Sequence, residues 1–256
     1  MDLELLIRAQ RVVSGERGEP EQARAIGVSN GRIEALQPVD TPATARTVLE
    51  LGSDVVLLPG LVDPHVHLCE PGNTRWEGFA TGTRAAAAGG VTTLVDMPVD
   101  SVPATVTAET LAIKRSAADR QCHVDVGFWG GAVPGNDGAR GPLRDAGVFG
   151  FKCFLIDSGV PEFPPLDERQ LARAAAQVAE LGSVLLVHAE DAAVIEQATR
   201  ATPPGAADYA TFLRSRPDNA ETEAIATVLA AARATGARVR ELPFTPERVK
   251  AALRAL

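Results

Sequence analysis

The chain has 256 residues, of which 45% are hydrophobic and 23% charged, an ordinary balance for a water-soluble globular protein of one large or two smaller domains. Its formal net charge of −8 argues against a nucleic acid or an anionic membrane surface as a partner. No apolar run approaches the ~20 residues that cross a bilayer, and Met1–Glu4 has neither the basic region nor the apolar core that opens a signal peptide.

Residues 1–54 predict a small, sandwich-like β-layer that forms a domain of its own. Short apolar segments lie at Leu5–Ile7, Ala25–Val28 and Arg32–Leu36. Asn30-Gly31 stands between the last two and is a typical hairpin turn signal.

From residue 55 the pattern changes to strand, loop, helix and strand, which predicts a parallel sheet with helices packed outside it. The expected strands are Val62–Leu68, Val91–Met97, Cys122–Trp129, Val148–Leu155, Val184–His188 and, more weakly, Ala237–Arg240. The expected helices are Trp76–Ala88, Ala108–Ala118, Leu166–Leu181 and Glu221–Thr235. Repeated units of this kind indicate an α/β fold of the TIM-type (β/α)8 barrel class, but six candidate strands leave that barrel incomplete.

The stretch Pro59–Gly72 contains two histidines, His65 and His67, separated by one residue. Alternate residues of a strand point to the same side, so both imidazoles would face one way. Two neutral imidazoles at a strand end make half of a zinc-type site. Taken alone, the spacing is more typical of two surface or core histidines that happen to alternate.

Lys152 lies in the apolar strand Gly150–Leu155. A buried ammonium is unfavourable unless it is neutralised or paired. One interpretation is a lysine whose head reaches solvent. The other is a neutral amine that adds carbon dioxide and becomes a carbamate with two oxygens for metal ions.

His188 ends the apolar strand Val184–His188, at the end of the strand where barrel sites are built. His123 begins its strand, so we interpret it as structural and expect it at the opposite end. Glu190 and Asp191 are expected to cap or begin the next helix, where negative charge is favourable.

Cys69, Cys122 and Cys153 are an odd number of cysteines and include no C-x-x-C pair, so a disulfide framework is not expected. A reducing, cytoplasmic setting follows from this pattern.

Several of these stretches together resemble the cyclic amidohydrolases, the relatives of allantoinase, dihydroorotase and hydantoinase. The resemblance to the allantoinase branch runs from about residue 5 to residue 239. The stretches that carry it best are Asp63–Gly72, Trp76–Gly78, Gly82–Met97, Cys122–Pro134 and Phe149–Pro165.

The resemblance implies a metal-dependent hydrolase that opens the ring amide of allantoin, a small cyclic ureide, to give allantoate in purine catabolism. It implies two divalent ions, zinc first of all, with Lys152 carboxylated and bridging both. His65 and His67 would hold one ion and His188 part of the other. It also implies a homo-oligomer, a tetramer in the family.

Four features depart from the family pattern. Cys69 stands where dihydroorotase relatives carry a substrate-binding arginine and allantoinase relatives an asparagine, and Asp100 replaces another common asparagine. The family's fourth histidine and its catalytic aspartate have no counterpart, because His188 and Asp218 are the last residues of their types.

Residues 55–240 are therefore expected to form the partial barrel with the metal site, and residues 241–256 a divergent helical tail. No catalytic residue can be assigned, and we expect the isolated chain to be weak or inactive, with its second metal position incompletely occupied. Two alternatives stay open: an amidohydrolase of the hydantoinase, dihydropyrimidinase or dihydroorotase type, and a non-catalytic partner of a full-length homologue.

Overall fold

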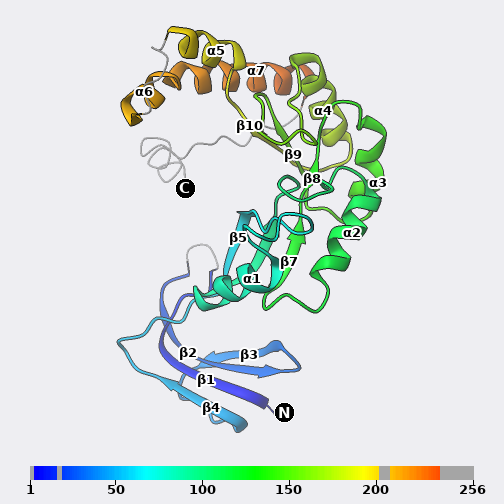
Figure 1. The fold of residues 1–256 in the computed structure, drawn as a ribbon. Coiled ribbons are helices and arrows are strands. Elements are labelled where there is room, and N and C mark those ends of the chain that lie inside the picture. Colours follow the sequence, from blue (N-terminus) through cyan, green and yellow to red (C-terminus); the bar gives the residue numbers. More distant parts are fainter. Residues whose placement is uncertain (1–2, 16–18, 202–207, 237–256) are drawn as a thin grey trace. The chain divides into compact units, whose positions relative to one another are not determined.

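The computed structural model describes residues 3–15, 19–201 and 208–236. The chain divides into two compact units, Met1–Leu61 and Val62–Leu256 (Figure 1). The expected sixth strand at Ala237–Arg240 and the tail at 241–256 lie outside the described residues.

The first unit contains one four-stranded sheet in the order β3-β2-β1-β4. The strands are β1 (Leu3–Val12), β2 (Gln22–Ser29), β3 (Arg32–Pro38) and β4 (Ala45–Leu51). β1 pairs antiparallel with β2 and parallel with β4. The hairpin predicted at Asn30-Gly31 is confirmed, since both residues have positive φ, 51° and 70°, as a primed two-residue turn requires.

The second unit contains two three-stranded sheets, β5-β6-β7 and β8-β9-β10. Their strands are β5 (Leu61–Val66), β6 (Val91–Asp96), β7 (Asp125–Phe128), β8 (Gly130–Gly131), β9 (Phe151–Phe154) and β10 (Leu185–His188). β6 pairs parallel with β7, and β9 pairs parallel with β8 and β10. Only Trp129 separates β7 from β8, so one extended segment passes from the first sheet to the second. Five of the six predicted strands are confirmed.

Helices follow the strands in the expected alternation. They are α1 (Phe79–Ala88), α2 (Ala108–Ala118), α3 (Arg140–Asp145), α4 (Glu168–Glu180), α5 (Ala192–Ala201), α6 (Tyr209–Arg214) and α7 (Asp218–Thr235). The four predicted helices are confirmed, while α3 and α6 were not expected. Capping boxes at Thr107 and Asp167 define where α2 and α4 begin.

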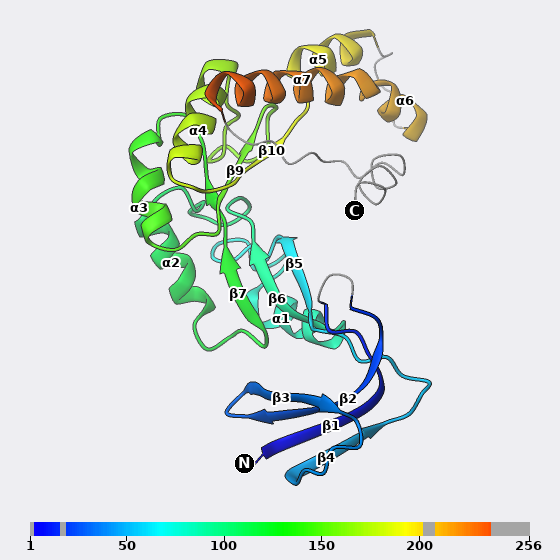
Figure 2. The same ribbon diagram turned by 180° about the vertical axis from the view of Figure 1, so that it is seen from behind.

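One hydrophobic core joins both sheets of the second unit to their helices. It contains strand residues such as Leu94, Phe128 and Phe151 and helix residues such as Leu111 and Leu171. Figures 1 and 2 show α2, α3 and α4 on the same side of the strands. This packing fixes the strands and hence the positions of the side chains at their carboxyl ends. No helix within the described residues is both long and apolar enough to span a bilayer.

Candidate metal centre

The four predicted metal ligands all belong to the second unit. His65 lies in β5 and His67 directly after it, Lys152 lies in β9, and His188 is the last residue of β10. In the parallel β9–β10 pair, His188 is opposite Phe154. Lys152 is opposite Leu186, two residues further from the carboxyl ends of the two strands.

The rings of His65 and His67 lie together, with centroids 5.5 Å apart and planes tilted by 38°. The pKa of His65 is lowered, first by burial and then by the positive charges of Lys152 and His67, with a smaller contribution from His188. The structure therefore brings the other three residues within electrostatic range of His65. A lowered pKa also keeps the His65 ring neutral, the form that binds metals.

Lys152 is buried, with 6% of its surface exposed. Its Nζ lies 4.9 Å from the centre of the Phe154 ring, and among the described residues no carboxylate or hydrogen-bond acceptor contacts it. Burial lowers the pKa of its ammonium, although the neighbouring Cys153 acts in the opposite direction. A buried amine without a partner favours the neutral form, which can react with carbon dioxide.

Phe154 also orients His188, because the two rings stack with centroids 5.0 Å apart and planes inclined by 21°. Nε2 of His188 lies 3.0 Å from a carboxylate oxygen of Glu190. The expected helix cap is confirmed at Asp191, whose carboxylate accepts from the backbone N–H groups of Ala193 and Val194. For Glu190 that expectation was wrong, because its side chain turns back to His188.

The donor set of the candidate metal centre is incomplete without Lys152. In the described part of the chain no three His, Cys, Asp or Glu side chains lie close enough to hold an ion by themselves. Three imidazoles and a partnerless buried amine, which as a carbamate would supply two oxygens, do fit one divalent ion and part of a second. His65, His67, Lys152 and His188 would therefore hold the metal, with Lys152 essential to the set.

A buried ion pair supports the backbone beside His67. The carboxylate of Asp96 at the end of β6 accepts from the N–H of Leu68 at 2.8 Å and lies 2.5 Å from Nζ of Lys114 on α2. Nζ of Lys114 also donates to the carbonyl of Met97 at 2.8 Å. Burial raises the pKa of Asp96, while Lys114 opposes that change. Sequence analysis missed this pair, although Lys114 lies three residues after Leu111, on the face of α2 that packs inward.

Cys69 and Asp100, the two departures from the family pattern, both adopt left-handed backbone conformations, with φ of 57° and 70°. Asparagine, which the family resemblance leads us to expect at these positions, tolerates this region better than most residues. Cys69 is buried, and burial followed by the nearby Asp100 raises the pKa of its thiol. Asp100 instead places Oδ2 2.7 Å from Nδ1 of His67.

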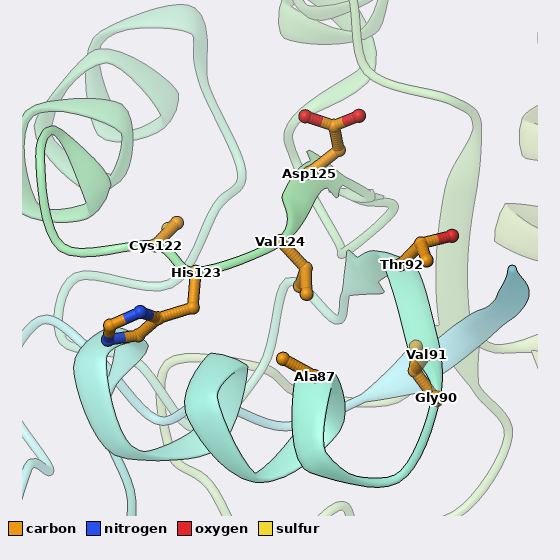
Figure 3. A pocket seen from close by; sticks show the side chains of 8 residues that line it. All are labelled: Ala87, Gly90, Val91, Thr92, Cys122, His123, Val124 and Asp125. Carbon is orange, nitrogen blue, oxygen red and sulfur yellow. The ribbon is translucent and has the colours of Figure 1, made fainter. Parts of the chain in front are cut away.

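Two hollows flank the strands of this unit. One, of about 460 Å³, lies at the amino ends of β6 and β7, where Cys122, His123 and Asp125 line it (Figure 3). His123 was expected to begin its strand; it lies two residues before β7, at the amino end of the strand and away from the four predicted ligands. The other, of about 270 Å³, lies beside Glu190 and Asp191 and includes the start of α4.

Comparison with known proteins shows the family to which the chain belongs. Residues 54–240 match the model of the family described as dihydro-orotase-like. The chain belongs to the dihydro-orotase-like family.

Among members of this family, the chain is 52% identical to an allantoinase of Streptomyces avermitilis over 94% of its own length and 53% of that protein's. It is 49% identical to an allantoinase of Saccharomyces cerevisiae over 73% of its own length and 40% of that protein's. The L-hydantoinase of Arthrobacter aurescens superposes on 92% of the chain, and on 52% of its own length, with a TM-score of 0.85 and 28% identity. The chain thus spans about half the length of these relatives.

Proposed function

We propose that the chain is the metal-binding part of an allantoinase-type cyclic amidohydrolase, which hydrolyses the ring amide of allantoin to allantoate. The observation that supports it most is the buried Lys152, which has no polar partner within the described residues and lies within electrostatic range of His65. The substrate is inferred from the allantoinases to which the chain is similar.

In this proposal Lys152 is carboxylated and contacts two divalent ions, zinc by first choice. His65 and His67 hold one ion and His188 part of the other. Bound ions would supply Lewis-acid activation of a water molecule and of the ring carbonyl. The chain's own residues orient the donors: Phe154 stacks on His188, and the Asp96–Lys114 pair holds the backbone beside His67.

Two parts of the family's site have no counterpart in this sequence, the fourth histidine and the aspartate that transfers a proton to the leaving nitrogen. Loss of a general acid–base costs about 10²–10⁴-fold in rate. We therefore expect the 256-residue chain on its own to be weak or inactive.

The surroundings of His67 favour an uncharged substrate. Cys69 takes the position of the arginine that binds a carboxylate in dihydroorotase relatives, and Asp100 adds a carboxylate close by. A substrate with its own carboxylate would lose its ion-pair partner and meet a like charge. Allantoin and hydantoins are neutral rings, and the structural similarity to L-hydantoinase makes hydantoin hydrolysis the second candidate.

We also propose that the second unit is the first part of a (β/α)8 barrel. Apolar side chains on its strands or just before them, Val62, Phe149 and Val184, are 61%, 61% and 46% exposed, so the described residues leave part of the strand surface uncovered. Association with further copies, as a homo-oligomer, would cover such surface. Three free thiols agree with a cytoplasmic location.

The test is turnover of allantoin by the purified chain, reconstituted with zinc and bicarbonate, with hydantoin and dihydroorotate as competing substrates. We expect slow release of allantoate, abolished in Lys152→Ala. Faster hydrolysis of hydantoin would support the second candidate. Absence of turnover and of calorimetrically detectable allantoin binding, together with co-purification of a longer relative, would support a non-catalytic partner instead.

A further inference from the structure

The sheet that contains β10 has one face that the helices of the second unit do not cover. Two residues of β10, Leu185 and Val187, pack against the hydrophobic core that joins the sheets to their helices. Because side chains alternate along a strand, Val184, directly before β10, points to the opposite face. Val184 is 46% exposed there, so this face has an apolar side chain in water.

Phe149 lies on the same face and is 61% exposed. A Cβ on Gly127 would collide with the Phe149 ring. Gly127 precedes Phe128, whose side chain belongs to the helix-covered core, so the Phe149 ring lies on the face away from the helices. Phe149 and Val184 are near each other along the sheet, because the N–H of Phe151 donates to the carbonyl of Val184 at 2.8 Å. We call the surface of Phe149 and Val184 the uncovered apolar face.

Residues 245–256 lie outside the described residues, but their sequence predicts a short amphipathic helix. Thr245 followed by Pro246 is typical of an N-cap and a first helical position. Phe244 and Val249 stand at the two positions of a hydrophobic staple. The apolar side chains recur at helical spacing, at Val249, Ala252, Leu253 and Leu256. Isolated helices shorter than ~12–15 residues are marginal in water, so this segment needs an apolar surface to pack on.

We propose that residues 245–256 of the same chain, and not a further copy, dock on the uncovered apolar face. α7 packs against α4 and the core, on the helix side of the sheet, and it ends beside α4 (Figures 1 and 2). Within the described residues β10 is the edge strand of its sheet. Residues 237–244 can extend over up to about 26–29 Å, whereas packed layers are only about 10 Å apart. The segment can therefore reach around β10 to the uncovered apolar face.

Charge favours this segment over a second copy as the occupant. Residues 237–256 contain five basic and two acidic side chains, whereas the whole chain has a formal net charge of −8. The basic segment is attracted to the acidic remainder of the chain, while two copies that each carry −8 repel one another. Val184 lies at the amino end of β10 and His188 at its carboxyl end. The docked segment therefore leaves the candidate metal centre open, and the inference is independent of the proposed function.

Photo-crosslinking of the full chain tests the inference, with p-benzoylphenylalanine in place of Phe149. Irradiation, proteolysis and mass spectrometry should identify cross-links to residues 245–256. Leu253→Asp, on the apolar side of the segment, should lower the cross-link yield about tenfold or more, because a leucine side chain would no longer be buried there. Arg254→Asp is the matched control, since it introduces the same side chain on the polar side, and it should leave the yield unchanged.

A mixture of ¹⁵N-labelled and unlabelled chain distinguishes the two occupants. Cross-links within one chain support the inference, whereas cross-links that join a labelled to an unlabelled peptide would show that a second copy covers the face and would overturn it. Cross-links only to other elements, such as α6, would overturn it too, as would equal losses of yield in Leu253→Asp and Arg254→Asp. The cross-link in the parent sequence decides the matter even where a variant fails to fold.

Discussion

Replacing Lys152 with methionine should raise the stability of the metal-free chain and abolish its metal binding. The lysine is 6% exposed and has no polar partner among the described residues, so folding takes most of its side chain out of water and gives the amine no hydrogen bond within the described structure. Protein mutational data put the cost of burying such a group at about 1–3 kcal/mol. Methionine has similar length and no such cost, so the free energy of unfolding should rise by about 1–3 kcal/mol.

The assay combines urea unfolding of the chelator-treated chain with zinc competition. Lys152→Ala and Lys152→Arg should both lose zinc, because neither can form the carbamate, and short carboxylic acids should partly restore binding to Lys152→Ala. Arg84→Met on the exposed side of α1 is the control and should change stability by no more than about 0.5 kcal/mol.

Parental zinc binding by Lys152→Arg would refute the reasoning, since a positive charge would then suffice. A loss of stability in Lys152→Met would also refute it. Lys152 would then be a core residue whose ammonium group contacts solvent or a polar group.

Three further predictions follow from other parts of the second unit. Elemental analysis of the reconstituted chain should find at most about one tightly held zinc, because three histidines and one modified lysine cannot close two sites; two tightly held ions would be incompatible with this ligand count. Lys114→Met should lower the free energy of unfolding by about 3–5 kcal/mol in urea titrations, because Asp96 would be left buried without its ion pair. Asp96→Asn combined with Lys114→Met should lower the free energy of unfolding by less. Burial raises the pKa of Cys153 from 9.0 to about 12, so a thiol reagent at pH 8 should modify this residue only after unfolding. The free energy of unfolding should also decline above about pH 9, because the thiol ionises in the unfolded chain but not in the folded one. Rapid labelling of Cys153 in the folded chain would contradict this.

The sequence predicts most of the second unit because its periodic signals are local. α2 begins at a capping box at Thr107 and α4 at one at Asp167. Both helices also have apolar residues at helical spacing, which can be recognised in the sequence. β4 was missed because its residues alternate poorly and most of them are exposed. α3 was missed because glycine and proline, Gly141 and Pro142, lie inside it, where they normally argue against a helix.

The four metal candidates could be named from the sequence because their motifs resemble those of a known family, but their carboxylate partners could not. Glu190 had an equally good local role as a helix cap, and only the path of the chain after β10 turns it toward His188. Asp100 reaches His67 from a loop in a left-handed conformation, a geometry that no periodicity records. Side-chain pairs between loops depend on tertiary structure, so only the structure reveals them.

The site depends on a residue that is itself no ligand, Trp129, where the two sheets of the second unit meet. Its backbone N–H donates to the carbonyl of Asp96 at 3.0 Å, and its indole N–H donates to the carbonyl of Pro64 at 2.8 Å, directly before His65. A Cβ on Gly150 would lie 2.6 Å from the indole ring, so glycine allows the start of β9 to pass against it. Trp129 therefore ties the strand of the paired histidines to the strand of Lys152. This contact contributes to the spacing between the imidazoles and the lysine, because within the described residues no helix or loop links those two strands directly.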